Sequence, residues 1–217
     1  MAPPRVAPAA ACILIASILA AQQQQQPPPP AGYTFGTTVV SSSGLEGRVY
    51  LIDQDTKKLP RFERMKPIGT IYTTSLNIWP QRFDEGFPGV TDRFEWFAID
   101  YTGRIWIGEP GVFRFSLLSD DGSKLSINGV TVVNLDGTHA PLGASGSAFL
   151  SRGVHQLRVS YYQGPAWAVA LVMAVARPGG GWKVFNTDDF PPPQDSSLWT
   201  KGEIRDVKDV PNPYARR

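Results

Sequence analysis

The sequence predicts an all-β domain, an antiparallel β-sandwich or a jelly-roll-like barrel, from three observations. Short segments alternate between apolar and polar residues with a period of two. In the segment 112–117 (VFRFSL), for example, Phe113 and Phe115 share one face. Turn signals such as Asn128-Gly129 separate these segments at short intervals. No long stretch has the 3.6-residue periodicity of a helix. Strands of this length and spacing are typical of sandwiches and barrels.

Further strands are expected where the same alternation recurs, in the segments 48–52, 104–107, 124–127 and 156–161. Turns are expected between strands at Thr102-Gly103, Glu109–Gly111, Asp121-Gly122 and Asp136-Gly137. The segment Trp167–Val175 is apolar on both faces, as a central strand or a buried helix would be. The preceding turn at residues 163–165 and the three valines of the segment favour the strand. Trp96 and Trp106 are expected in the core, the usual place of tryptophan in a sandwich.

The first 31 residues predict export and a tether. Residues 1–21 combine a positive start, a short apolar run and small residues at the end, as a signal peptide does. The apolar run is shorter than the ~20 residues of a comfortable membrane span, and an uncleaved anchor is the alternative. Residues 22–31, rich in Gln and Pro, predict an extended spacer. We therefore expect a secreted protein, periplasmic or at the cell surface, with no transmembrane segment in the mature chain.

The remaining chain predicts one domain followed by a tail. Residues 32–186 contain the alternating segments, and residues 187–217 are rich in proline and charge, which predicts a largely irregular tail. Such a tail could also dock on the domain through Trp199. The only cysteine, Cys12, lies within the predicted signal peptide, so no disulfide is expected in the mature chain.

The charge pattern excludes two classes of partner. The formal net charge of the 217 residues is +2, and Lys and Arg are scattered along the sequence. Nucleic acid and anionic membranes attract a stripe of one sign, which the sequence does not show. We therefore expect no nucleic-acid partner.

The sequence also lacks the signature of an enzyme. Glycosidases hold two carboxylates several ångströms apart. The acidic pairs here, at 84–85, 120–121 and 188–189, are adjacent in sequence, so they point to opposite faces of a strand or crowd one loop. No nucleophile elbow, zinc-protease helix or phosphate loop is present in the sequence either. A catalytic role is not expected.

Three segments carry a family resemblance. Residues 111–129 (GVFRFSLLSDDGSKLSING) resemble the central hairpin of the protective-antigen domain family, and 150–165 resemble its late strand and loop. The segment 83–97 is similar to the bacterial fibro-slime subgroup. The resemblance covers roughly residues 44–185, and it implies a β-sandwich of about a dozen strands that often binds glycans.

The resemblance also implies a calcium site. In sugar-binding members of the family, two consecutive aspartates joined by a cis peptide hold calcium, and these correspond to Asp120 and Asp121. The neighbouring loop falls near Gln163 and Gly164, where yeast members have an asparagine. The longer glutamine side chain shifts the ligand geometry. Adjacent carboxylates in one loop can converge on a cation that takes six to eight oxygen ligands.

Three more residues are candidates for ligand contact. Asp136 and His139 lie in a loop expected beside the aspartates, and Trp167 follows the loop at Gln163. Exposed aromatic side chains suit a lectin because sugar rings stack on them.

Two functions therefore remain open. One is a glycan-binding, lectin-like module, with calcium as the cofactor and a cell-surface polysaccharide as the partner. The other is a structural or protein-interaction module in which residues 120–122 form a plain hairpin turn with Asp-Gly in its centre.

Overall fold

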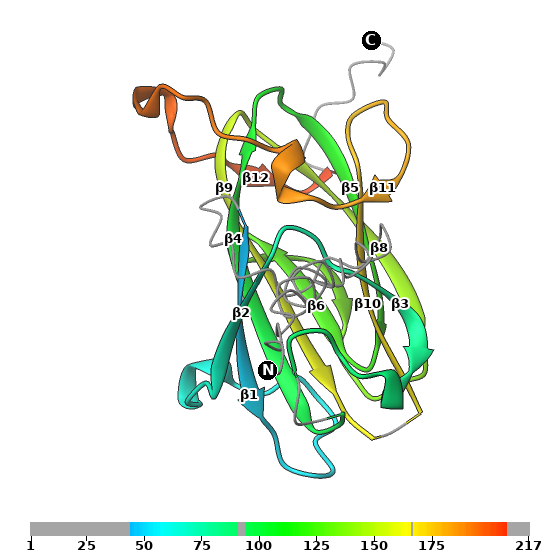
Figure 1. The fold of residues 1–217 in the computed structure, drawn as a ribbon. Coiled ribbons are helices and arrows are strands. Elements are labelled where there is room, and N and C mark those ends of the chain that lie inside the picture. The colour runs from blue at the N-terminus through cyan, green and yellow to red at the C-terminus, as the bar shows by residue number, and fades with distance from the viewer. Residues whose placement is uncertain (1–43, 91–93, 166, 208–217) are drawn as a thin grey trace, which may run out of the picture. The chain divides into compact units, whose positions relative to one another are not determined.

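The computed structural model describes residues 44–90, 94–165 and 167–207. The predicted signal peptide and spacer, and residues 208–217 of the predicted tail, lie outside these residues. In the described part of the chain, twelve strands form two antiparallel sheets of six strands each (Figure 1). The predicted all-β fold class is thereby confirmed, as an open sandwich instead of a closed barrel.

The first sheet has the strand order β2-β1-β4-β9-β6-β7. Its strands are β1 (Leu45–Leu51), β2 (Gly69–Thr73), β4 (Phe97–Ile107), β6 (Ser123–Ile127), β7 (Val130–Leu135) and β9 (Gly153–Gln163). The second sheet has the order β11-β10-β5-β8-β12, and β3 also pairs with β10. Its strands are β3 (Asn77–Arg82), β5 (Gly111–Asp120), β8 (Leu142–Leu150), β10 (Ala168–Ala176), β11 (Lys183–Val184) and β12 (Ile204–Arg205).

The core lies between the sheets and follows the alternation seen in the sequence. Phe113, Phe115 and Leu117 of β5 point into it, and Ile99 and Tyr101 of β4 face them from the other sheet. The two-faced apolar segment forms β10, which pairs with β5 on one side and with β3 and β11 on the other. Burial of these side chains provides the main driving force for folding, at roughly 25 cal/mol per Å² of apolar area.

A second, smaller hydrophobic cluster lies on the outer face of the first sheet. The connection between β1 and β2 contains the short 3-10 turn η1 (Phe62–Arg64), and Phe62 packs there against Tyr50, Ala98 and Tyr162. The rings of Tyr50 and Phe62 meet edge to face, with centroids 5.1 Å apart. We call this group the outer cluster. It fixes the connection against the sheet.

Two predicted turns differ from the structure. Thr102-Gly103 lies inside β4, where a Cβ on Gly103 would come within 2.6 Å of Leu45 Cδ2, so the glycine serves close packing and not a turn. Asp121-Gly122 is not a hairpin turn, because β5 belongs to the second sheet and β6 to the first. The chain crosses between the sheets at this point, and the sequence could not show it because a crossover and a hairpin can use the same short polar connection.

Two tryptophans expected in the core are only half-buried. Trp96 packs at the margin of the outer cluster, and Trp106 lies on the outer face of β4. Trp106 alternates with Ile105 and Ile107, which take the inward positions of that strand.

Residues 187–207 dock on one end of the sandwich. They contain the 3-10 turns η3 (Thr187–Asp189) and η4 (Ser196–Leu198), and β12 pairs with β8. The N–H of Gly202 donates to the carbonyl of Val154 at 2.8 Å, and the N–H of Val154 donates to the carbonyl of Thr200 at 2.7 Å. The indole N–H of Trp199 donates to the carbonyl of Pro193 at 2.8 Å. The Trp199 bond lies within the segment, so backbone pairing with β8 and Val154 holds it on the domain.

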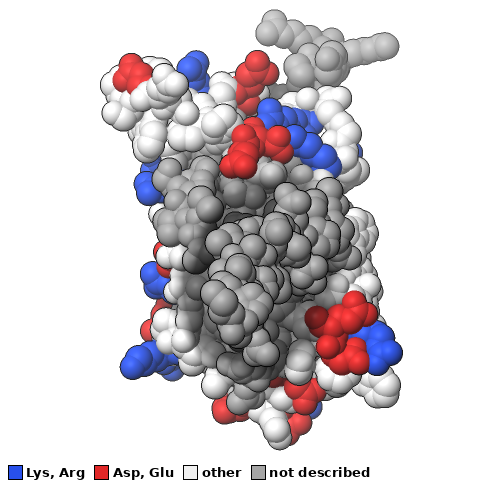
Figure 2. All heavy atoms as spheres, in the orientation of Figure 1, with Lys and Arg blue, Asp and Glu red and all other residues white. Residues whose placement is uncertain are grey.

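The outer surface carries charges of both signs. On the face drawn in Figure 2, Lys and Arg side chains lie interspersed with those of Asp and Glu. Among the described residues, no helix has the length and apolarity needed to cross a membrane.

Candidate functional site

The predicted site lies where the chain crosses between the two sheets. Asp120 ends β5, Asp121 begins the crossover to β6, and the peptide bond between them is cis. Gln163 ends β9, and Gly164 follows it. The connection between β7 and β8, which contains His139, reaches the same place. Three connections far apart in the sequence therefore meet at one end of the sandwich.

Asp121 is held by two backbone groups. Its Oδ1 accepts the N–H of His139 at 3.0 Å, and its Oδ2 accepts the N–H of Gly164 at 2.7 Å. Burial raises the pKa of this carboxyl, and the two N–H groups oppose that rise because they favour the charged form. Asp121 therefore joins the two neighbouring connections to the crossover.

Asp120 is buried without a comparable partner. The residue is 6% exposed, and its carboxylate makes no hydrogen bond to the described residues. Burial, and then the neighbouring charge of Asp121, raise the pKa of Asp120 to about 7. A buried carboxylate without a donor is costly, and a bound cation would relieve that cost.

Gln163 is fully buried and engaged at both ends of its amide. Its Oε1 lies 2.6 Å from the hydroxyl of Tyr161, and its Nε2 donates to the carbonyl of Ala168 at 3.0 Å. The same Tyr161 hydroxyl lies 2.7 Å from the carbonyl oxygen of Asp120. A hydroxyl has one proton to donate, so it serves one of these two oxygens at a time. Gln163 is thus connected to Asp120 through Tyr161.

His139 and Asp136 are placed differently from each other. The ring nitrogens of His139 face the carbonyl oxygens of Ala140 and Leu135, at 3.0 and 2.9 Å, so its contribution to Asp121 comes from the backbone. Asp136 is exposed, and its Oδ1 accepts the N–H of Leu59 at 2.7 Å. Asp136 therefore links the connection between β7 and β8 to the connection between β1 and β2, which contains Phe62 of the outer cluster.

Trp167 is the exposed aromatic residue beside this site. Its side chain is 87% exposed, and it stands between Gly164 and the start of β10. An indole in this position offers an open apolar face to a ligand.

Sequence reasoning missed Tyr161, Tyr162 and the role of Gly122. Tyr161 ends the alternating segment 156–161 and its ring lies in the core, but alternation gives no sign of where the hydroxyl points. The hydroxyl of Tyr162 pairs with Thr138 Oγ1 at 3.0 Å. A Cβ on Gly122 would come within 2.4 Å of the Tyr162 ring, so only glycine allows the crossover to pass so close.

The donor chemistry of the site fits a hard cation such as calcium. Calcium prefers carboxylate, amide and carbonyl oxygens, and the buried Asp120 carboxylate has no other partner. Asp121 has remaining lone pairs, because each of its oxygens accepts one N–H. In the described part of the chain, no third Asp, Glu, His or Cys joins the pair, so further ligands would be backbone carbonyls or water.

Comparisons with known proteins agree with this architecture. The PA14 domain model matches residues 41–187. A PA14 sugar-binding domain from an RTX adhesin superposes with a TM-score of 0.55 at 19% identity, over 67% of this chain and 96% of that one. The PA14 domain of the MpAFP antifreeze protein superposes with a TM-score of 0.55 at 18% identity, over 75% of this chain and 94% of that one. An anti-sigma factor domain-containing protein from Clostridium clariflavum superposes with a TM-score of 0.54 at 17% identity, over 77% of this chain and 53% of that one. No curated protein sequence matches the chain significantly.

Proposed function

Because the chain belongs to the PA14 domain family, we propose that it is a calcium-dependent glycan-binding module without catalysis of its own, exported to the cell surface. The observation that carries this proposal is the buried Asp120 carboxylate, which lacks a hydrogen-bond donor at the end of the sandwich. The sugar-binding PA14 domain of the RTX adhesin has the same fold and supports the assignment. The segment 83–97 leads us to place the chain in the fibro-slime subgroup.

Each residue of the site has a separate task in this proposal. Asp120 and Asp121 would hold the calcium ion, and the ion would supply positions at which sugar hydroxyl oxygens replace water. The N–H groups of His139 and Gly164 orient Asp121. Gln163 and Tyr161 support the backbone beneath Asp120. Trp167 offers an exposed ring on which the apolar face of a sugar can stack.

Calcium titration by calorimetry tests the metal. We expect stoichiometric binding to the protein and its loss in Asp120→Asn and Asp121→Asn variants, because calcium needs charged oxygens there. Asp55→Asn, in an exposed connection of the first sheet, is the matched control and should bind as the parent does. No heat of binding at millimolar calcium would overturn the calcium site and favour a structural or protein-interaction module.

A glycan array with and without calcium tests the ligand. We expect binding that EDTA abolishes and that Asp120→Asn lacks, while Trp167→Ala weakens it by about tenfold, corresponding to ~1.4 kcal/mol. Glycan binding that survives both EDTA and Asp120→Asn would contradict the calcium-dependent mechanism.

A further inference from the structure

The outer face of the first sheet contains a long groove away from Asp120 and Asp121. Two hollows of about 990 and 770 Å³ lie on it, and both are lined by Arg104 and Gln156. These two residues are cross-strand partners in β4 and β9, so the two hollows meet over this pair. Between Val154 and Ser160 the floor extends ~20 Å, at about 3.3 Å per residue. We call the combined hollow the outer groove.

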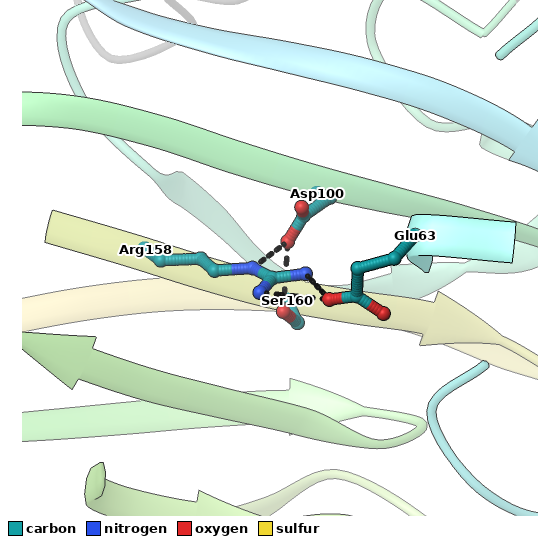
Figure 3. Close-up of polar contacts among 4 residues, drawn as sticks. All are labelled: Glu63, Asp100, Arg158 and Ser160. Carbon is teal, nitrogen blue, oxygen red and sulfur yellow. Dashed lines mark hydrogen bonds and ion pairs between the residues drawn. The ribbon is translucent and has the colours of Figure 1, made fainter. Parts of the chain in front are cut away.

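The groove has a fixed wall at each end. At one end stand Leu59–Glu63, beside the outer cluster. Figure 3 shows how they are held: Arg158 donates from Nε to Asp100 at 2.7 Å and from Nη2 to Glu63 at 3.2 Å, and Ser160 donates to Asp100 at 2.8 Å. At the other end the docked segment contributes Pro191, Pro192, Trp199 and Lys201.

The carboxylates that line the groove have partners, whereas several of its cationic side chains have none among the described residues. Its carboxylates have partners: Glu46 pairs with Arg48, Glu63 with Arg158, and Asp136 accepts the N–H of Leu59. Four cations that line it make no hydrogen bond or ion pair with the described residues: Arg61, Arg104, Lys124 and Lys201. They come from four separate elements, so the groove presents free positive charge that is not apparent in the sequence.

The remaining lining suits a sugar chain. Tyr72 lies at one end of the groove, and Trp106 and Trp199 lie at the other, so flat apolar rings are available for stacking. Hydroxyl and amide groups of Thr102, Ser126 and Gln156 lie between them. Polar groups set among aromatic rings recognise a ligand with both hydroxyls and apolar faces.

We propose that the outer groove is a second glycan-binding site, and that it takes a linear acidic polysaccharide of the uronate class. Arg104, opposite Gln156, binds a sugar carboxylate near the middle of the floor. Lys124, opposite Ser160, binds another at the end near Glu63. Trp199 stacks on a ring at the far end. An arginine binds a carboxylate with two parallel hydrogen bonds. The carboxylates of Glu46 and Glu63 remain in the groove and oppose a denser polyanion such as DNA, which has a charge every ~1.7 Å.

Binding of a galacturonic acid hexasaccharide, measured by calorimetry with EDTA present, tests the proposal. We expect the protein to bind it, and a neutral glucose hexasaccharide to bind far more weakly. Arg104→Gln with Lys124→Gln should reduce affinity for the uronate by at least about tenfold, since two charge-assisted contacts are lost. Lys66→Gln is the control, because Lys66 is exposed and lines neither hollow.

The outcomes separate this site from the calcium site. Asp120→Asn should leave uronate binding unchanged, so failure of the calcium proposal does not affect this one. The groove proposal is overturned if the uronate does not bind, if the double variant binds it as the parent does, or if Lys66→Gln loses as much. Equal affinity for a single-stranded oligonucleotide would also overturn it and indicate an unselective polyanion surface.

Discussion

At the residue scale, two adjacent aspartates have different surroundings. Asp121 accepts two backbone N–H groups, whereas the carboxylate of Asp120 accepts none from the described residues. The difference arises because the N–H groups of His139 and Gly164 donate to Asp121 and not to Asp120. Asp120 is therefore the carboxylate whose charged form a bound cation would stabilise most.

A pH dependence follows from the raised pKa of Asp120. The pKa in the folded protein, about 7, exceeds the ordinary 3.8, so the folded state binds the proton more tightly. The protonated Asp120 carboxyl contributes fully to the free energy of unfolding below the ordinary pKa. That contribution is lost as pH rises through about 7. Without calcium, we expect the free energy of unfolding to fall by on the order of 2 kcal/mol between about pH 5 and 8, relative to Asp120→Asn.

Urea denaturation of both proteins across this pH range measures the difference. Burial lowers the pKa of His155, which favours stability at higher pH, but His155 is present in both proteins and cancels. Parallel pH profiles would show that Asp120 does not titrate near 7. Calorimetry should also show calcium affinity falling by up to about tenfold per pH unit below 7, because protons compete for Asp120.

At the scale of elements, the segment 187–207 completes the domain. Its strand β12 extends the second sheet, and its backbone pairs with β9 at Val154. Gly202 makes this approach possible, since a Cβ there would come within 2.0 Å of His155 Nε2. His155 is itself fully buried, and its Nε2 lies 2.9 Å from the carbonyl of Ser151. The imidazole of His155 is thus enclosed by the connection at Ser151 and by the docked segment at Gly202.

Gly202→Ala should loosen this docked segment. The added methyl group cannot fit without moving the backbone away from His155, at a cost of about 1–3 kcal/mol. Hydrogen exchange should show faster exchange of the backbone amide of residue 202, which donates to the carbonyl of Val154 in the parent, with little change in β5. Gly181→Ala is the control because its Cβ would meet nothing within 4 Å. Unchanged exchange in Gly202→Ala would show that the backbone accommodates the methyl group.

At the scale of the molecule, the crossover site joins the two sheets. Asp120 ends a strand of the second sheet, and Asp121 is bonded to Gly164 at the end of the first. A ligand bound there stabilises contacts of both layers at once. The outer groove, by contrast, lies on one sheet and is completed by the docked segment.

Calcium should therefore shift the melting of the whole sandwich. We expect one cooperative transition, with tryptophan fluorescence and far-ultraviolet circular dichroism coincident. At one hundred times the dissociation constant, calcium should add about 2.7 kcal/mol. The Asp120→Asn variant should show no shift. Two separate transitions, of which only one responds to calcium, would contradict a site that couples the sheets.

Local pattern predicted much of this molecule. Alternation in β5 and β9 predicted their inward faces, because the pleat sends successive side chains to opposite sides. The two-faced run predicted the central strand β10. The resemblance at 111–129 selected the two aspartates that the fold buries together. These features depend on residues that are close together in the sequence, so a local sequence pattern is enough to predict them.

What the sequence alone determined is therefore the all-β class, the strand faces and the candidate aspartates. Only the tertiary structure decided that the chain crosses between the sheets at Asp121-Gly122. It also decided that the backbone N–H of His139 donates to Asp121, and that the hydroxyl of Tyr161 contacts the amide oxygen of Gln163. It also gathered Arg61, Arg104, Lys124 and Lys201 into one groove. The physical reason is that strand pairing joins residues tens of positions apart, and a local pattern has no information about which strand becomes the neighbour.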